Sequence, residues 1–382
     1  MPVRLNPAVL PAATETLRQQ VRDFLAAELA AKRFVPGCDK WLGGFDLEFS
    51  KRLADNGWLG MTWPKQYGGH ERSALDRYVV TEELLAAGAP VAAHWVGDRQ
   101  SGPSLLRYGT EQQKQQYLPA MASGEHYFAI GMSEPGSGSD LASARTKADK
   151  IDGGWRLNGR KIWCSSAHRV DSFILFCRTQ APSDDRHAGL SQFLVDLKSP
   201  GITIRPMNLL SGEHHFNEVF IDNVEVGDDC LLGKEGDGWA QVTSELAFER
   251  SGPERFLSTF PALVAVLKRL GRDADRGQQL VIGRMVAQLR ALRGMSVSVA
   301  AALDKGEAPN VEAALVKDLG TRFEGDMVEQ IRLLLETQPE YGSDDELDRL
   351  LAESFLHMPG FTLRGGTNEI LRGVVARGLG LR

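Results

Sequence analysis

The most informative segment of the chain reads Met132-Ser133-Glu134-Pro135-Gly136-Ser137-Gly138-Ser139-Asp140. It follows a short apolar run, Tyr127 to Gly131, and precedes Leu141. Gly136 and Gly138 carry no side chain, so their backbone amides can approach a ligand closely. The polar side chains between them can cap a following turn, and their hydroxyls can donate to phosphate oxygens. On these residues alone, a tight surface turn and one wall of a ligand site are equally good interpretations.

The pattern of apolar residues changes on either side of this segment. Helical spacing runs up to about Glu125, for example at Leu17, Val21 and Leu25, and it returns from Trp239 to the end. Between them, short apolar and period-two runs predict strands at Trp155–Leu157, Lys161–Cys164, Ser172–Arg178, Ser191–Leu197, Ile202–Arg205 and Glu218–Val226. Asn158-Gly159, between the first two runs, predicts a hairpin turn, because both central residues of that turn need positive φ.

Composition narrows the class of protein. The chain has 382 residues, 42% of them hydrophobic, and a net charge of -6. No Lys and Arg cluster is present, so a nucleic-acid partner is not expected. Four scattered cysteines without a Cys-x-x-Cys pair indicate a reducing compartment. No apolar stretch reaches the ~20 residues of a membrane span, and Met1 to Val21 does not resemble a signal peptide. We expect a cytoplasmic protein with no membrane contact.

Several common motifs are missing. No Gly-x-Gly-x-x-Gly follows a predicted strand, and no Gly-x-Ser-x-Gly is present. Gly227 to Lys234 has the wrong spacing for a phosphate-binding P-loop, and Glu235 stands where Ser or Thr is required. His214-His215 lacks a third ligand at metal spacing, so two surface histidines are expected there and no metal. Dinucleotide-binding Rossmann folds and α/β-hydrolases are therefore disfavoured.

Three further segments allow a functional and a structural interpretation. In Gly159–Ser166, Trp163 can cover a flat aromatic cofactor or pack in the core of a strand. In Leu246–Arg250, Glu249 is either a solvated acid or an inward carboxylate with a raised pKa. Leu363–Gly373 has two glycines and an N-cap threonine, and is either a plain helix start or an open ligand loop.

Taken together, these segments resemble the acyl-CoA dehydrogenase family over nearly the whole chain. The likeness extends to Gly57-Trp58 with Trp63–Gly69, to Tyr108–Pro119 and to Asn217–Val224. It implies an α+β multidomain fold. The expected parts are an N-terminal helical domain at 1–126, a middle β-barrel-like domain at 127–235 and a C-terminal four-helix bundle at 236–382.

The resemblance also implies FAD as the cofactor and gives residues their roles. Met132 and Ser133 would lie against the isoalloxazine ring. Trp163 would stack at the flavin, with Ser165 bonding beside it. The remaining expected flavin contacts are Gly138, Ser139, Gly366, Thr367 and Glu369, and Ser139 would also meet the CoA arm. The implied reaction removes an α-proton from an acyl-CoA thioester and a hydride from its β-carbon, and the electrons pass to an electron-transfer flavoprotein.

The position of the base departs from the commonest pattern in the family. Gly365 occupies the place just before the Gly-Thr pair where the base usually stands, and glycine cannot act. One branch of the family, with isovaleryl-type and steroid-degrading members, carries its glutamate on the first helix of the C-terminal domain. Glu249 occupies that place and is the predicted base. Phe248 and Arg250 are expected at the substrate, and Gly365 would offer its amide to the thioester oxygen.

A second departure concerns assembly. The family's Arg-x-x-Phe-Gly element is missing near Asp275–Ile282, and Ile331–Leu347 replaces its Gln-x-x-Gly-Gly element. In the family both elements reach the adenine end of a neighbouring subunit's flavin. The chain is therefore expected to form either a heteromer with a sister subunit or a homo-oligomer, dimer or tetramer, with an altered adenine site. The rival functions are a flavin oxidase or monooxygenase of the same fold, and a non-catalytic partner subunit. His94 and Trp95 line the acyl pocket or serve the core.

Overall fold

The computed structural model describes residues 3–335 and 338–381, without the side chains of residues 245–249. These residues pack into two compact units, each built from segments far apart in the sequence. The helical unit comprises Met1–Gly44, Arg72–Pro90 and Ala247–Arg382, and the sheet unit comprises Phe45–Glu71 and Val91–Leu246.

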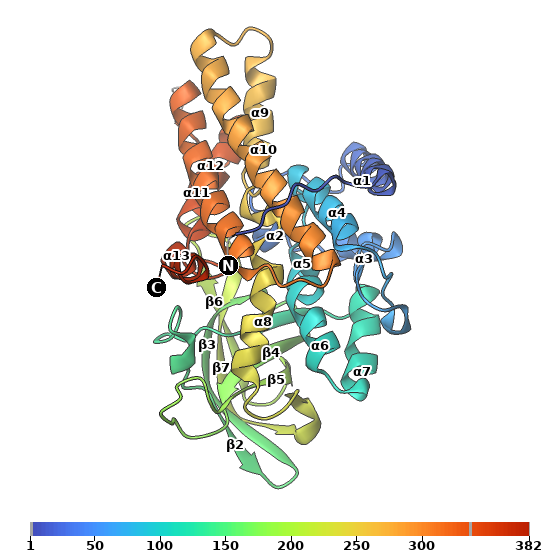
Figure 1. Cartoon of the computed structure of the whole chain (residues 1–382), viewed down its shortest axis with the longest axis vertical. Coiled ribbons are helices and arrows are strands. Elements are labelled where there is room, and N and C mark those ends of the chain that lie inside the picture. Colours follow the sequence, from blue (N-terminus) through green and yellow to red (C-terminus); the bar gives the residue numbers. More distant parts are fainter. Residues whose placement is uncertain (1–2, 336–337, 382) are drawn as a thin grey trace. The chain divides into compact units, whose positions relative to one another are not determined.

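The sheet unit contains one eight-stranded sheet in the order β6-β7-β3-β2-β4-β5-β8, with β1 paired to β4 (Figure 1). Only the β1–β4 and β2–β4 pairings are parallel among the described strands. The strands are β1 (Phe128–Gly131), β2 (Lys147–Ile151), β3 (Gly154–Ser165), β4 (Ser172–Arg178), β5 (Leu190–Asp196), β6 (Ile202–Asn208), β7 (His214–Gly227) and β8 (Leu231–Leu232).

Burial explains the two kinds of strand. Residues 172–177 of β4 are all buried, as expected for a strand covered on both faces. In β7, buried and more exposed positions alternate over residues 214–221, as expected where one face is solvated. The continuous apolar run that predicted β4 and the period-two run that predicted β7 therefore reflect their positions in the sheet.

The hairpin predicted at Asn158-Gly159 is wrong. β3 continues through these residues, with a register irregularity between Leu157 and Gly159. The chain instead reverses at Asp152-Gly153, where Ile151 pairs with Gly154 and Gly153 has a φ of +71°. Gly159 is needed for close approach, because a Cβ there would lie 2.4 Å from the Thr146 hydroxyl oxygen. Asp-Gly and Asn-Gly give the same turn signal, and only the pairing of the whole sheet separates them.

Helices cover part of the sheet within the same unit. They are α3 (Leu47–Asp55), α5 (Ala92–Val96), α6 (Gly102–Tyr108) and α7 (Glu111–Ala122). Leu105 of α6 and Leu118 of α7 pack with Phe128, Ile174 and Leu194 of the sheet in one buried apolar cluster. This packing fixes β1, and with it the start of the segment that follows at Met132.

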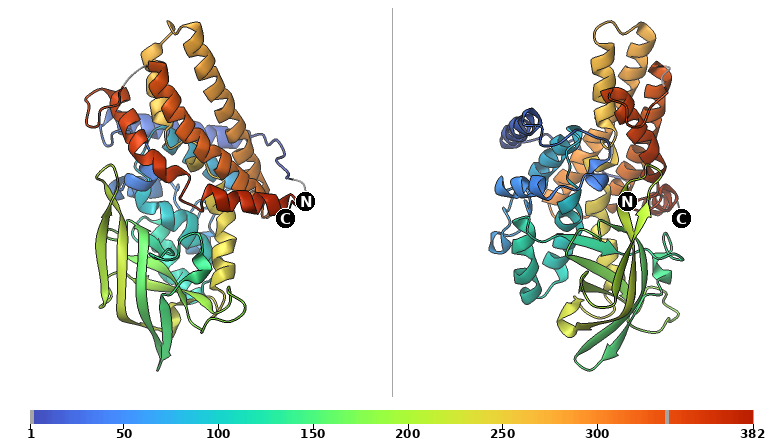
Figure 2. Two further views of the ribbon diagram at one scale, coloured as in Figure 1. Left: turned by 90° about the vertical axis from the view of Figure 1, so that its left-hand side faces the viewer. Right: turned by 180° about the vertical axis from the view of Figure 1, so that it is seen from behind.

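The helical unit contains α1 (Ala12–Ala30), α2 (Lys40–Gly43), α4 (Ala74–Ala86), α9 (Phe260–Leu270), α10 (Arg276–Asp304), α11 (Asn310–Leu335), α12 (Glu346–Phe361) and α13 (Asn368–Gly378). Helices α9 to α12 pack as a four-helix bundle, drawn in orange and red in Figure 2, and α13 packs on α11. Helix α8 (Gly238–Arg250) begins in the sheet unit and ends in the helical unit.

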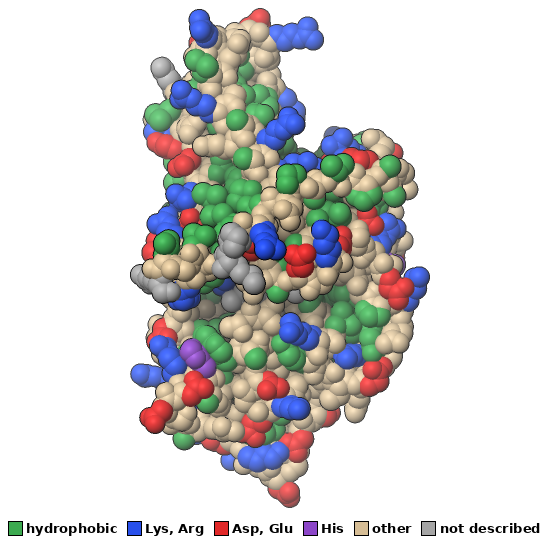
Figure 3. Space-filling view, in the orientation of Figure 1, with side chains coloured by type: hydrophobic (Ala, Val, Ile, Leu, Met, Phe, Trp, Pro, Cys, Tyr) green, Lys and Arg blue, Asp and Glu red, His purple; other side chains and the backbone are tan. Residues whose placement is uncertain are grey.

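The predicted class, an α+β fold with a sheet between helical segments, is confirmed. The three sequence boundaries stay a prediction, since the compact units combine distant segments. Among the described helices, none is both long and apolar enough to cross a membrane. On the face drawn in Figure 3, Lys and Arg side chains are interspersed with Asp and Glu.

Candidate functional site

A buried ion pair holds the Met132–Asp140 segment onto the sheet. Lys161 of β3 is 0% exposed, and its ammonium lies 2.8 Å from the Glu134 carboxylate. It also donates to the carbonyl of Met132 at 3.0 Å. The same carboxylate accepts from the backbone N–H groups of Arg145 at 2.7 Å and Thr146 at 2.9 Å. Glu134 therefore faces inward and fixes the segment.

Burial raises the pKa of the Glu134 carboxyl, but the Lys161 ammonium and the backbone donors outweigh it and hold that pKa below its usual value. Burial lowers the pKa of the Lys161 ammonium, and Glu134 partly offsets the effect. The Met132–Asp140 motif was recognised in the sequence, but Lys161 was not predicted as the partner of Glu134. Its only signal is a charged residue inside a strand, which does not say which face it occupies.

The segment divides its polar residues between structure and surface. Glu134 and Ser137 exchange backbone hydrogen bonds of 2.9 and 3.0 Å, and the Ser137 hydroxyl donates to the carbonyl of Asp140 at 2.9 Å. The Asp140 carboxylate pairs with Ser143 and Arg186, and so closes the turn that begins at Leu141. Ser137 and Asp140 are thus committed to the turn.

The glycine edge of the segment is open. Gly136 and Gly138 are exposed, and a Cβ at either position would meet no atom within 4 Å. The predicted ligand contacts here, Gly138 and Ser139, both lie on the exposed side. The glycines are therefore not required by close packing inside the chain, which leaves approach by a ligand as their use.

Trp163 lies beside this segment on β3. The N–H of Ile162 donates to the carbonyl of Ser133 at 2.9 Å, which joins the two stretches. Trp163 has a φ of +60° and is 50% exposed, and its ring rests edge-on against Phe216 at 5.5 Å. A bulky residue in the left-handed region is rare and concentrates at functional sites. The core interpretation of Trp163 is thus disfavoured, since the indole presents a flat surface to the exterior.

Three hydroxyls of this segment and of β3 are available to a ligand. Ser133 and Ser165 are partly exposed and Ser139 is exposed, and within the described part of the chain their side chains make no hydrogen bond. An exposed indole with neighbouring hydroxyl donors suits a flat heteroaromatic ligand, because it offers both stacking and hydrogen bonding. Met132, at the edge of a buried cluster with Phe176 and Val242, adds an apolar contact.

The loop before α13, in the helical unit, contains two left-handed glycines. Gly365 has a φ of +69° and Gly366 a φ of +86°. The buried guanidinium of Arg250, which is 7% exposed, donates from Nε to the Gly365 carbonyl at 3.2 Å. A Cβ on Gly365 would lie 2.9 Å from Arg255. Both the backbone angle and this contact therefore favour glycine at position 365.

Thr367 and Glu369 form the start of α13, as the sequence predicted. The Thr367 oxygen accepts from the N–H of Ile370 at 3.4 Å. Hydrogen bonds from its own N–H and from the Thr367 hydroxyl lower the pKa of the Glu369 carboxyl. The N–H of Asn368 donates to the Thr362 carbonyl at 3.1 Å, so the first three N–H groups of α13 all have acceptors within the chain. The positive end of the helix dipole still favours an anionic ligand group, as the predicted flavin contacts require.

Glu249 and Phe248 lie in α8, but their side chains fall outside the described residues. Their roles as base and substrate contact stay predictions. Arg250 is described, and its bond to Gly365 shows that it supports the glycine loop.

The candidate histidines have structural contacts. His94 is buried, its Nδ1 lies 2.8 Å from the Ser50 hydroxyl, and burial lowers its pKa to about 4. His214 is exposed and stacks on His168 at 3.9 Å, but His215 is buried, so the expectation of two surface histidines is wrong for one of them. No cluster in the described residues could hold a metal ion.

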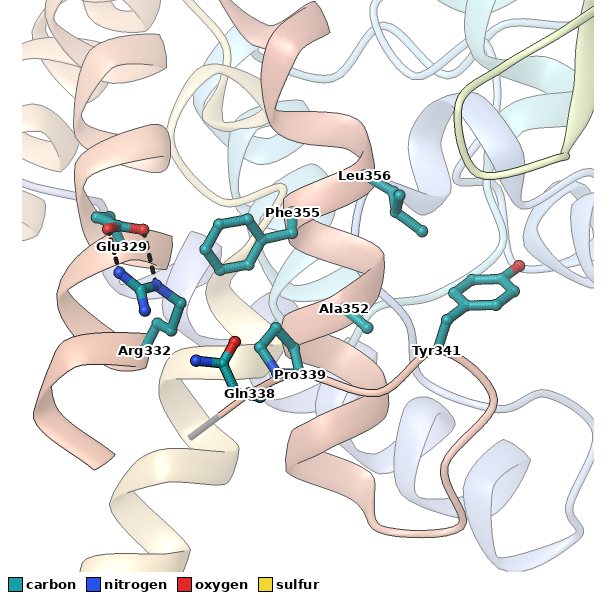
Figure 4. Close-up of a pocket in the computed structure, with 8 residues that line it drawn as sticks. All are labelled: Glu329, Arg332, Gln338, Pro339, Tyr341, Ala352, Phe355 and Leu356. Carbon is teal, nitrogen blue, oxygen red and sulfur yellow. Dashed lines mark hydrogen bonds and ion pairs between the residues drawn. The ribbon is translucent and has the colours of Figure 1, made fainter. Parts of the chain in front are cut away.

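The segments that replace the two expected family elements adopt their own structures. Asp275 and Gln278 form a capping box that starts α10. The replaced region around Ile331 belongs to the end of α11 and the connection to α12, and a pocket of about 550 Å³ opens there (Figure 4). Its lining combines apolar and polar groups: Glu329, Arg332, Gln338, Pro339, Tyr341, Ala352, Phe355 and Leu356. No pattern in the sequence predicted this pocket.

Comparison with known proteins places these features in a family. Profiles of the acyl-CoA dehydrogenase N-terminal, middle and C-terminal domains match residues 11–125, 129–224 and 236–380. Acyl-CoA dehydrogenase IpdE1 of Mycobacterium tuberculosis is 34% identical over 96% of this chain and 97% of its own length. Acyl-CoA dehydrogenase FadE34 of the same organism is 35% identical over 86% of this chain, and that match spans only 45% of FadE34.

Solved structures agree. The steroid ACAD Tcur3481-Tcur3483 has 30% identity and a TM-score of 0.85, with 100% of both chains covered. The ChsE4-ChsE5 complex from Mycobacterium tuberculosis has 27% identity and a TM-score of 0.84, covering 99% of this chain and 100% of the other. Because these matches span the whole chain and its three successive segments, the chain belongs to the acyl-CoA dehydrogenase family of FAD-dependent oxidoreductases.

Proposed function

We propose that this chain catalyses the α,β-dehydrogenation of an acyl-CoA thioester to the 2-enoyl-CoA and passes the electrons to an electron-transfer flavoprotein. The observation that carries the proposal is the exposed, left-handed Trp163 with the unpartnered hydroxyls of Ser133 and Ser165 beside it. This donor set fits a flavin. When bound, FAD supplies the hydride acceptor that the reaction requires.

The chain's own residues would divide the remaining work. Glu249 removes the α-proton, and Gly365 offers its N–H to the thioester oxygen, where charge develops as the proton leaves. The inward bond from Arg250 to the Gly365 carbonyl supports this role, since it holds the loop in place before substrate arrives. Phe248 and Arg250 belong to the substrate side in this proposal.

The flavin contacts are proposed on both units separately. In the sheet unit, Met132, Ser133, Trp163 and Ser165 meet the ring, and the open edge at Gly138 and Ser139 meets the pyrophosphate or the CoA arm. In the helical unit, Gly366, Thr367 and Glu369 meet the ribityl and phosphate part. The positive end of the α13 helix dipole, which begins at Asn368, supports the latter assignment.

An anaerobic screen of acyl-CoA thioesters tests the reaction. The expected result is bleaching of the flavin absorbance by at least one thioester, with loss of bleaching in Glu249→Gln. The matched control is Glu307→Gln, an exposed position between α10 and α11, which should bleach like the natural protein. Bleaching by Glu249→Gln at the natural rate would reject Glu249 as the base.

The choice of thioester and the electron acceptor are part of the proposal. A bulky acyl group is favoured, because one similar structure is a steroid ACAD. The screen should therefore compare steroid-derived, branched and straight-chain thioesters. Rapid reoxidation of the reduced protein by oxygen, and none by an electron-transfer flavoprotein, would replace the dehydrogenase proposal with an oxidase.

We infer that the chain assembles with a sister subunit. The segments that would reach a neighbour's adenine site have other structures here, namely the capped start of α10 and the pocket at the end of α11. One similar structure is a complex of two differently named chains, ChsE4 and ChsE5. Copurification decides: a homogeneous homo-oligomer that retains one flavin per chain would contradict this inference.

A further inference from the structure

Lys317, in α11, is a fully buried cation that bonds to the stretch between the end of α12 and the start of α13. Its side chain is 0% exposed. The ammonium donates to the Thr362 carbonyl at 3.1 Å, the Gly366 carbonyl at 2.8 Å and the Asn368 side-chain oxygen at 2.6 Å. A lysine ammonium has three N–H donors, so it can serve all three acceptors at once. Thr362 is the C-cap of α12, Gly366 lies in the following loop, and Asn368 is the first residue of α13.

The same loop is tied down at three consecutive residues. The Arg364 guanidinium forms two hydrogen bonds to the buried Asp39 carboxylate, at 2.6 and 2.8 Å. The Gly365 carbonyl accepts from Arg250, and the Gly366 carbonyl accepts from Lys317. Glycines have the weakest backbone preferences, so two adjacent glycines without these bonds would leave the loop in many conformations. The bonds from Arg250 and Lys317 select one.

The geometry of the peptide group means that the direction of each bonded carbonyl also sets the direction of the N–H that follows it. In a trans peptide the C=O and the following N–H lie in one plane and point in opposite directions. The carbonyl of Gly366 points at Lys317, so the N–H of Thr367 points away from it. The carbonyl of Gly365 points at Arg250, so the N–H of Gly366 points away as well. The two cations therefore turn the carbonyls inward and leave N–H groups for a ligand.

We propose that Lys317 is a positioning residue of the dehydrogenation reaction. It holds the Thr362–Asn368 backbone so that the loop's N–H groups are aimed before the substrate and the flavin bind. The proposal rests on the proposed function, because it is that function which gives the loop its ligands. Lys317 contacts neither ligand in this proposal, and it acts through the Gly366 carbonyl and the Asn368 side chain.

Removal and chemical replacement of the ammonium test the proposal. Lys317→Ala deletes three carbons and the nitrogen, a gap that n-propylammonium matches. The kcat for a thioester that bleaches the natural protein is expected to fall about 100-fold, the cost of roughly 1 Å of misplacement, with little change in KM. Added n-propylammonium should restore kcat in proportion to its concentration, whereas n-propanol of the same shape should not. Lys305→Met, at the exposed end of α10, is the matched control and should match the natural protein.

Hydrogen exchange of the FAD-free protein gives a readout that does not need activity. The backbone amides of residues 362–368 should exchange at least about 10-fold faster in Lys317→Ala, because lost hydrogen bonds raise the population of open loop. Exchange in α1 and α4 should not change. Asn368→Ala, which removes one of the three acceptors, should show a smaller increase and covers the case in which Lys317→Ala does not fold.

The outcomes separate this proposal from the proposed function. Natural kcat and natural loop exchange in Lys317→Ala would overturn the positioning role while dehydrogenation stands. A reduced kcat that n-propanol restores as well as n-propylammonium would also overturn it, since filling a cavity would then suffice. No turnover of any thioester by the natural protein would instead reject the proposed function, and the positioning role would fall with it, even if loop exchange still responded.

Discussion

Lys161→Met should destabilise the protein strongly at pH 7 and less strongly at pH 5. The substitution keeps the length of the side chain and removes a charge that is 0% exposed. Its partner Glu134, 7% exposed, would remain buried without the ion pair of 2.8 Å. Breaking a buried pair in this way costs about 3–5 kcal/mol. The bond to the Met132 carbonyl, at 3.0 Å, is lost as well.

The sign follows from the pKa of Glu134. In the natural protein that pKa is lowered, so its stabilising contribution is present above the unfolded value of about 4.3 and is lost as pH falls through the lower folded value. In Lys161→Met the cation is absent and burial remains, which raises the folded pKa above the unfolded one. The difference in free energy of unfolding between the natural protein and the variant should therefore shrink as pH falls from 7 toward 5, since the other titrating groups are common to both.

Denaturant unfolding at pH 7 and pH 5 measures both effects. Lys147→Met is the matched control, because its pair with Asp149 joins side chains that are 58% and 54% exposed and is worth at most about 1 kcal/mol. Lys161→Met combined with Glu134→Gln should recover part of the loss, since no buried charge is then left alone. A loss under about 1 kcal/mol at pH 7, or a further loss at pH 5, would refute the assignment of a charged buried pair.

Three other substitutions have defined outcomes. Asp39→Asn leaves the Arg364 guanidinium without its carboxylate and should lower the free energy of unfolding by about 3 kcal/mol at pH 7, measured with denaturant. Gly365→Ala must adopt a φ of +69° and meet Arg255, so it should lower stability by at least about 1 kcal/mol and lower kcat, and unchanged values would contradict a strained loop. Trp163→Ala should weaken flavin binding about 10-fold in a titration of FAD-free protein while the unfolding midpoint stays the same, because the indole is half exposed.

Structure was predicted correctly from the sequence where a local pattern is compatible with only one local conformation. The apolar run at Ser172–Arg178 is β4 with the same bounds. Gly365 and Gly366 form the loop before α13, and Thr367 is its N-cap. The open edge at Gly138 also follows from its motif. In each case the physical cause acts within a few residues: strand burial, the N-cap bond, or the absence of a side chain.

The roles of residues whose partners are distant in the sequence were not predicted. Lys161 lies in β3, where buried and exposed positions are mixed. Its ion pair with Glu134 shows that it faces inward. Lys317 has an ordinary helical context, and its three acceptors lie 45 to 51 residues further along the chain. A buried charge is tolerated only with such partners, so its role cannot be read from its neighbours in sequence.

The glycine at position 365 links the loop to the choice of base. Its positive φ and the nearby Arg255 disfavour any side chain there, and glycine offers backbone groups but no base. The base must then come from another element, and Glu249 is the proposed one. Arg250, the next residue on α8, bonds to the Gly365 carbonyl and so fixes the end of that helix against the loop.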